Sequence, residues 1–154
     1  MSKTQYESYN KFDVVFADFG CNPNGVEGGK RPAVIVSCDA SNHGGAPQVS
    51  LVPLSTKLKN IPVHVLIRPE DARGDCIKKY SHFMPENIQT IPKRHIQDKR
   101  GFIPESSRIR EQIDRALIAQ FDLLPMARKI VFEEINQGIM KKEGKAYEKG
   151  DKKG

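Results

Sequence analysis

Short apolar runs between turn residues constrain this chain more than any other feature of its sequence. Four runs rich in β-branched residues are separated by clusters of Gly, Pro, Asn and Asp: Asp13–Phe19, Pro32–Cys38, Gln48–Leu54 and Pro62–Ile67. Runs of this length and spacing are typical of strands in a small antiparallel sheet or barrel. A fifth run, Ser81–Ile91, contains Pro85. Proline has no amide hydrogen to donate to a neighbouring strand, so this run predicts a bulge or an edge.

The pattern then changes to a helical period. Five apolar residues share one helical face: Ile109, Ile113, Ala116, Leu117 and Phe121. They predict a helix from about Glu105 to Phe121 that packs on the sheet. The fold class is therefore mainly β with α, an α+β arrangement.

The 154 residues are enough for one domain with tails. We expect a flexible arm at 1–11, one domain at 12–124 and a basic extension at 125–154. A weaker amphipathic pattern through Ile139 predicts a helix in the extension, followed by a disordered Gly- and Lys-rich end.

Composition excludes several classes of protein. No run approaches the ~18 apolar residues of a membrane span, and residues 1–11 lack the apolar segment of a signal peptide. A cytoplasmic protein without membrane contact is expected. Cys21, Cys38 and Cys76 are odd in number and widely spaced, which argues against disulfides and zinc ligation. The net charge of +6 slightly favours a polyanionic partner, although it also serves solubility.

The segment Gly20–Arg31 is rich in glycine and ends in two cations at the start of a strand. Gly28 and Gly29 permit a ligand to approach the backbone closely. Arg31, if held by the strand, could present its planar guanidinium to a phosphate through two hydrogen bonds. On spacing alone, a hairpin with a solvated basic end is the better interpretation, because no phosphate-binding G-x-x-x-x-G-K-[ST] motif is present.

Two further sets of polar residues lie at or near the ends of apolar runs. Ser55, Thr56 and Lys57 follow the third run, where they could point into a groove or form a turn. Glu86 and Asn87 lie beside the expected bulge. They could contact base edges or lie on a solvated strand edge.

The histidines His43, His64, His82 and His95 lack the spacing of metal ligands, and His64 lies inside an apolar run. A packed or surface role is expected for each. The chain also has no G-x-S-x-G motif and no cysteine in a known nucleophile context. Neither metal-dependent hydrolysis nor acyl transfer is indicated.

The order of these motifs adds information that none carries alone. DVVFADFG, GGKRPAVIVS, VPLSTKL, PVHVLI and ENIQTI, followed by EQIDRALIAQFDLL, resemble the MazF/PemK family of toxin endoribonucleases over about residues 9–124. The resemblance implies an SH3-like antiparallel β-barrel of the MazF/PemK/CcdB type with one main helix. It also implies a homodimer whose interface groove takes single-stranded RNA, a cognate antitoxin that blocks the groove, and contact with operator DNA only through the antitoxin complex.

The implied activity is sequence-selective cleavage of mRNA without a metal or cofactor. The ribose 2′-OH attacks the adjacent phosphorus and leaves a 2′,3′-cyclic phosphate and a 5′-OH. By the resemblance, Arg31 stands at the family's arginine and supplies the catalytic cation. Ser55 stands at the family's threonine, whose hydroxyl hydrogen-bonds the scissile phosphate.

The resemblance also implies a set of substrate-binding residues: Glu27, Lys30, Thr56, Lys57, Glu86 and Asn87. The loop GVEGG is one residue shorter than the family's loop, which leaves open whether Glu27 reaches the groove. Gln89 stands where an arginine is common, and Glu86–Asn87 replaces the usual Glu-Gln pair, so the cleaved sequence should differ. The alternative is a non-catalytic binding module, or a CcdB-like toxin that targets gyrase. Retention of both Arg31 and Ser55 argues against that alternative.

Overall fold

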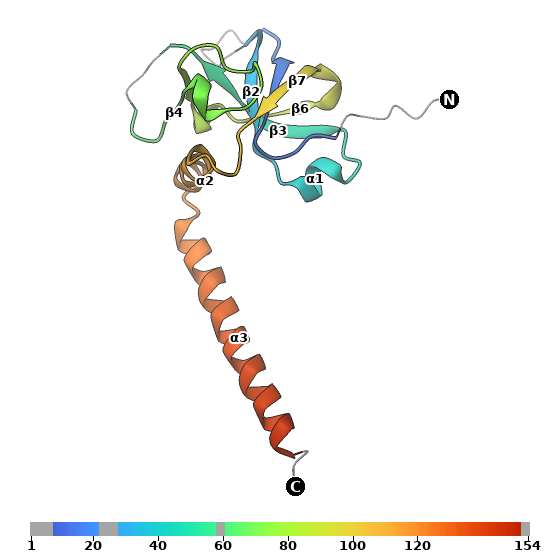
Figure 1. Ribbon diagram of the computed structural model, residues 1–154, viewed down its shortest axis with the longest axis vertical. Helices are drawn as coiled ribbons and strands as arrows, with labels where there is room; N and C mark the ends of the chain where they lie inside the picture. Colours follow the sequence, from blue (N-terminus) through green and yellow to red (C-terminus); the bar gives the residue numbers. More distant parts are fainter. Residues whose placement is uncertain (1–7, 22–27, 58–60, 152–154) are drawn as a thin grey trace, which may run out of the picture. The chain divides into compact units, whose positions relative to one another are not determined.

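The structure, a computed structural model, describes residues 8–21, 28–57 and 61–151 (Figure 1). The chain divides into two units, residues 1–120 and 121–154. The first unit contains the seven strands found in the described residues: β1 (Asp13–Asp18), β2 (Lys30–Ile35), β3 (Gln48–Ser55), β4 (Val65–Ile67), β5 (Ser81–Phe83), β6 (Gln89–Pro92) and β7 (Ile96–Phe102). The expected α+β class with a predominance of strands is confirmed.

All strand pairings are antiparallel, in the order β4-β5-β3-β2-β1-β7, with β6 also paired to β3. The first half of β3 pairs with β6, whereas its last two residues pair with β5. Within the described residues the sheet does not close into a full barrel. A single bridge between Arg73 and Phe102 joins the segment after β4 to β7.

Alternate residues of the central strands enter two separate cores. Val34 and Val52 belong to the core that also contains residues of α2 (Ile109–Gln120). Ala33 and Leu51 belong to the second core, on the opposite face of the sheet. Each fully buried aliphatic side chain stabilises the fold by about 1.5–3 kcal/mol. Residues at the ends of β2 and β3 are therefore held in a fixed register.

Helix α2 begins later than its apolar pattern predicts. The amide of Ser107 donates to the carbonyl of Pro104 over 3.0 Å, which closes a turn before the helix. The hydroxyl of Ser107 then accepts a hydrogen bond from the amide of Ile109 at 3.2 Å. Such a capping contact satisfies an amide that has no partner inside the helix. The prediction of a helix was right, but its start at Glu105 was wrong.

The run Ser81–Ile91 is not one bulged strand. A 3-10 turn, η2 (Pro85–Asn87), separates β5 from β6. Pro85 occupies the first position of this turn, where its missing amide hydrogen costs nothing. The chain turns at this point, so β5 and β6 pair with opposite ends of β3.

Two elements have no counterpart in the sequence predictions. The strand β7 is mostly polar, with Ile96 its buried apolar residue, and it pairs along β1. The short helix α1 (Asp39–His43) packs by Asn42, which is 1% exposed and hydrogen-bonds to Ser37. Backbone pairing and local polar contacts, rather than apolar periodicity, hold these two elements.

The second unit consists mainly of helix α3 (Leu124–Asp151). It agrees with the helix expected through Ile139 but continues to Asp151, where disorder was expected. The Lys, Glu and Ala residues of this stretch have high helix propensity, which offsets the cost of its glycines. Apolar side chains on α3 are exposed, among them Val131, Phe132 and Ile135. Among the described helices, none combines the length and the apolar character needed to cross a bilayer.

Candidate functional site

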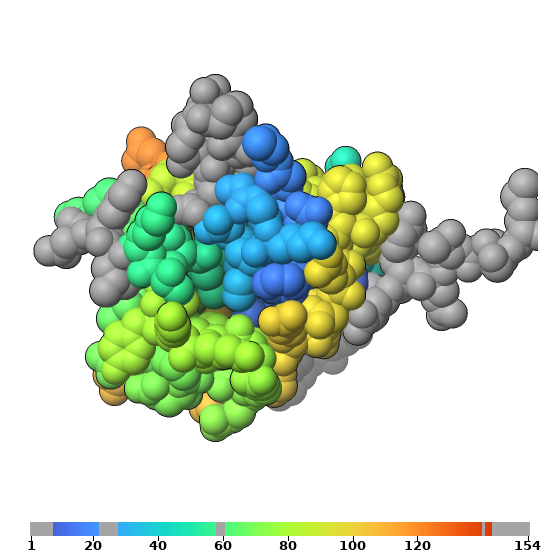
Figure 2. Space-filling model, turned by 90° about the horizontal axis from the view of Figure 1, so that it is seen from above, coloured from blue at the N-terminus to red at the C-terminus, as the bar shows by residue number. Residues whose placement is uncertain are grey.

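The register of β2 and β3 brings Arg31 and Ser55 to neighbouring positions. The two strands form three antiparallel pairs in one register: Ala33 with Pro53, Val34 with Val52 and Ile35 with Leu51. Continuing this register by two residues sets Arg31 across from Ser55. Arg31 also pairs with Ala17 of β1, so β2 is still a strand at this position. Figure 2 shows the start of β2, in light blue, beside β1, in darker blue.

Backbone hydrogen bonds hold the segment before Arg31. Gly29 donates to the carbonyl of Gly20 over 2.7 Å and accepts from Phe19 over 2.9 Å. Gly29 adopts a φ of 74°, a conformation that favours glycine. Nε of Arg31 donates to the carbonyl oxygen of Gly28 at 2.8 Å. The guanidinium is therefore fixed against the end of the loop, whereas Glu27 lies outside the described residues.

Ser55 is the last residue of β3 and is only 4% exposed. Its Oγ accepts a hydrogen bond from the amide of Lys57 at 3.2 Å. This contact forms a turn, which is one of the two interpretations that the sequence allowed for this segment. The hydroxyl keeps a hydrogen that it can donate to an anion. Thr56 and Lys57 are exposed next to it, as is Lys30 at the start of β2.

Glu86 and Asn87 lie in the turn η2 rather than on a strand edge. Oε1 of Glu86 lies 2.5 Å from Nε2 of His64. The amide nitrogen of Asn87 contacts Sδ of Met84 at 3.9 Å. The carboxylate of Glu86 thus already has a hydrogen-bond partner in the protein, which competes with its expected contact to a base.

One histidine that was expected to be packed or on the surface lies next to Ser55, and a second one contacts the first. His82 of β5 pairs directly with Ser55 of β3. The rings of His64 and His82 meet edge to face, with their centroids 6.0 Å apart. The side chain of His64 is 2% exposed, which agrees with packing. Because strand register joins residues 27 positions apart here, no local sequence pattern could indicate this cluster.

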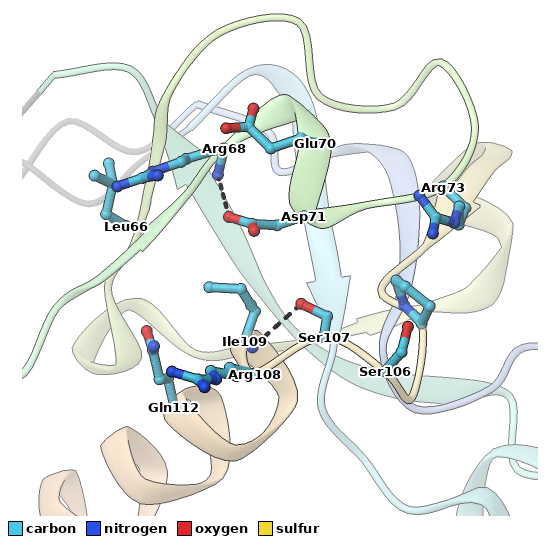
Figure 3. Close-up of a pocket in the computed structure, with 11 residues that line it drawn as sticks. Leu66, Arg68, Glu70, Asp71, Arg73, Ser106, Ser107, Arg108, Ile109 and Gln112 are labelled. Atoms are coloured by element: carbon cyan, nitrogen blue, oxygen red, sulfur yellow. Dashed lines mark hydrogen bonds between the residues drawn. The ribbon is translucent and has the colours of Figure 1, made fainter.

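Figure 3 shows a different cavity, of 520 Å³, that none of the expected site residues lines. Arg68, Glu70 and Asp71 border it from the segment after β4, and Arg108 borders it from the start of α2. Hydrogen bonds from the amide of Arg68 to Asp71 and from that of Ile109 to Ser107 stabilise its walls. With Arg73, three arginines and two carboxylates line this cavity, so charges of both signs border it.

The cysteines divide by burial. Cys21 and Cys38 are exposed, whereas Cys76 is buried. Burial raises the pKa of the Cys76 thiol above its usual value. In the part of the chain that the structure describes, His, Cys, Asp and Glu side chains form no group of three that could hold a metal ion.

Comparisons with known proteins agree with this fold. Residues 10–121 match the family model described as PemK-like, MazF-like toxin of type II toxin–antitoxin system. The chain is similar to the endoribonuclease MazF of Staphylococcus epidermidis, with 32% identity over 107 residues that cover 68% of this chain and 84% of that protein.

Solved structures give the same result. One is a mycobacterial endoribonuclease in complex with its cognate antitoxin, with 26% identity and a TM-score of 0.59 over 75% of this chain and 96% of that one. MazF of Deinococcus radiodurans aligns with a TM-score of 0.61 over 75% of this chain and 98% of that one. Its identity is 15%, so this second match supports the fold alone.

Proposed function

Because the chain belongs to the family of PemK-like, MazF-like toxins of type II toxin–antitoxin systems, we propose that it is a sequence-selective endoribonuclease that cleaves single-stranded mRNA without a metal ion. The ribose 2′-OH attacks the adjacent phosphorus, and the products carry a 2′,3′-cyclic phosphate and a 5′-OH. The protein acts as a homodimer and is neutralised by a cognate antitoxin. The mycobacterial relative bound to its antitoxin supports such a partner.

The observation that supports this proposal is the register of β2 and β3, which sets Arg31 opposite Ser55 when it is continued by two residues past the Ala33–Pro53 pair. In-line attack at phosphorus requires a cation on the phosphoryl oxygens and hydrogen-bond donors in fixed positions. The guanidinium of Arg31, fixed by the Gly28 carbonyl, supplies the charge. The Ser55 hydroxyl supplies a donor to the scissile phosphate.

The remaining residues of the proposed site bind the substrate. Lys30, Thr56 and Lys57 are exposed beside Arg31 and Ser55, where they can contact the RNA backbone. Glu27 is assigned to the same set. Asn87 and Glu86 contact bases from the turn η2, and Glu86 does so with a carboxylate already bonded to His64.

One observation favours the non-catalytic alternative, a binding module or a gyrase-targeting toxin on the same fold. Ser55 is 4% exposed, and its oxygen already accepts the Lys57 amide. A hydroxyl engaged in this way could serve the turn alone. The two functions differ in what the purified protein does to RNA.

The test is cleavage of transcripts by the purified protein in EDTA, with detection of cyclic-phosphate and 5′-hydroxyl ends. We expect cleavage by the wild type and a loss of at least about 10²-fold in rate for Arg31→Ala, because a transition-state charge partner is removed. Arg94→Ala, at an exposed arginine of the turn η3 (Lys93–His95), is the matched control and should keep its rate. Circular dichroism checks that each variant folds.

Two results would contradict the proposal. Cleavage that stops in EDTA would exclude a metal-independent reaction. Intact RNA together with double-strand DNA breaks after expression in cells would favour the gyrase-targeting alternative.

A further inference from the structure

The proposed reaction needs a group that takes the proton of the attacking 2′-OH. Neither residue at the centre of the proposed site can serve. A guanidinium remains protonated and has no acceptor, and the oxygen of a neutral serine hydroxyl is a very weak base. Another side chain near Arg31 and Ser55, an unprotonated imidazole or a carboxylate, must therefore accept the proton. The carboxylate of Glu86 is already bonded to His64.

His82 occupies that position. It pairs directly with Ser55 in the β3–β5 ladder, so both side chains lie on the same face of the sheet. Residues directly opposite in such a ladder have Cβ atoms about 4.5–5.5 Å apart. By the register of β2 and β3, Arg31 lies on the other side of Ser55. The three side chains thus form one row across neighbouring strands.

His64 and Glu86 support the ring of His82 from the other side. The rings of His64 and His82 make an edge contact at 74°. Nε2 of His64 bonds to Oε1 of Glu86 at 2.5 Å, and a carboxylate can only accept, so this nitrogen carries the hydrogen. Nδ1 of His64 is buried and has no hydrogen-bond partner among the described residues. Glu86 therefore fixes the tautomer and orientation of His64, which in turn packs against His82.

We propose that His82 is the proton acceptor of the RNA cleavage reaction, an assignment that rests on the endoribonuclease function proposed for this site. The 2′-oxygen forms a bond to phosphorus as its proton passes to the His82 imidazole. Nδ1 of His82 is buried, so Nε2 takes the proton. The bond between phosphorus and the 5′-oxygen breaks while the Arg31 guanidinium stabilises the charge on that oxygen. The oxygen then takes a proton from solvent water, and the His82 imidazolium returns its proton to solvent. The products are the cyclic phosphate and the free 5′-OH.

The charges around His82 determine how the reaction depends on pH. His64, from the segment before β4, contacts the ring of His82, and Glu86 of η2 bonds to His64. Arg31 lies beyond Ser55 when the register of β2 and β3 is continued. Arg115 of α2 shares a cavity with His64. Since an imidazole accepts a proton only in its neutral form, the rate should rise with pH through the histidine range, between about pH 5 and 8. Glu86→Gln removes a nearby negative charge but keeps an acceptor for His64, so it should move this rise to lower pH.

The experiment measures single-turnover cleavage by the full-length protein between pH 5 and 8.5. Its substrate is an RNA oligonucleotide whose sequence comes from the 5′-hydroxyl ends of transcripts cut by the wild type. We expect His82→Gln to reduce the rate by about 10²-fold or more and to remove the rise between pH 5 and 8. His95→Gln, at an exposed histidine, is the matched control and should keep the wild-type rate and its rise with pH.

A structural role would give a different result. The same oligonucleotide with a 2′-deoxy nucleotide at the cleaved position cannot react, so it measures binding alone. His82→Gln should bind it as tightly as the wild type, because the variant loses proton transfer and not affinity. A structural role of His82 would weaken this binding as well. His82→Val suits a strand better than glutamine and guards against a folding defect. A folded His82→Val with the same low, pH-independent rate supports the assignment.

Two outcomes separate this inference from the function on which it rests. If Arg31→Ala is inactive while His82→Gln keeps the wild-type rate and pH profile, the role of His82 is wrong and the ribonuclease function stands. If the wild type does not cleave RNA, both are wrong.

Discussion

Cys76 illustrates how the position of a single side chain sets its chemistry. The residue is 3% exposed, and its Sγ donates to the carbonyl of Arg73 at 3.4 Å. Burial in apolar surroundings disfavours the thiolate and raises the pKa of this thiol above its ordinary value. The folded chain therefore binds the Cys76 proton more tightly than the unfolded chain does.

We predict a loss of stability at high pH that depends on Cys76. A raised pKa in the folded state stabilises the fold fully below the unfolded pKa of about 8.5, and this contribution declines as pH rises above it. Cys76→Ala lacks this titration, so the difference in free energy of unfolding between wild type and variant should shrink between pH 8 and 10.5. Urea unfolding at several pH values measures this. An unchanged difference over that range would contradict the prediction, and Cys38→Ala serves as the exposed control.

The residues of the candidate site were predictable to different degrees. Arg31 and Ser55 stand in recognisable motifs, so the sequence alone could indicate them. His82 could not be found in this way, because its proposed role depends on pairing with Ser55 across the β3–β5 ladder. Non-local register of this kind is set by tertiary packing rather than by neighbouring residues.

At the scale of elements, the contact between β7 and the segment after β4 depends on Gly101. A Cβ added at Gly101 would collide with the carbonyl oxygen of Arg73 and lie 2.8 Å from Sγ of Cys76. The backbone oxygen of Arg73 accepts the amide of Phe102 at 3.1 Å, so it cannot move without breaking the bridge.

Gly101→Ala should therefore reduce the free energy of unfolding by about 1–3 kcal/mol, the usual cost of overpacking. Gly138→Ala is the matched control, because an added Cβ there meets no atom within 4 Å. In a helix this second substitution should be neutral or stabilising. Thermal unfolding of both variants measures the difference, and equal stability of Gly101→Ala and wild type would show that the contact can relax.

Elements with apolar periodicity were predicted, and elements held by other forces were not. The apolar, β-branched runs of β1 and β3 and the apolar face of α2 are local signals. The edge strand β7 has no such signal, since its backbone pairing with β1 is what holds it. The start of α2 was misplaced because Ser107, rather than the apolar face, sets where the helix begins.

At the scale of the whole molecule, the two units differ in how they are stabilised. The buried hydrophobic residues of both cores lie between Tyr9 and Ala116, inside the first unit. In α3 the large apolar side chains are exposed, and Phe132 is 65% exposed. The first unit therefore has its own cores.

We predict that a shortened protein ending at Gln120 folds. Its thermal unfolding midpoint should equal that of the first unit, residues 1–120, within the full-length protein. Differential scanning calorimetry measures both midpoints, and near-ultraviolet circular dichroism checks the packing of the aromatic side chains. A midpoint lower by more than about 4 °C, which corresponds to roughly 1 kcal/mol in a domain of this size, would mean that the second unit stabilises the first.

The enclosure of β3 on both faces limits how this segment can evolve. Val49 and Leu51 enter one core, while Val52 and Leu54 enter the other. Adding or deleting one residue in this strand would exchange the two sets of side chains and turn Ser55 away from His82. Descendants of this gene can therefore accept replacements of equal length along β3, but insertions and deletions should accumulate elsewhere, as in the exposed turn at Gly44 and Gly45.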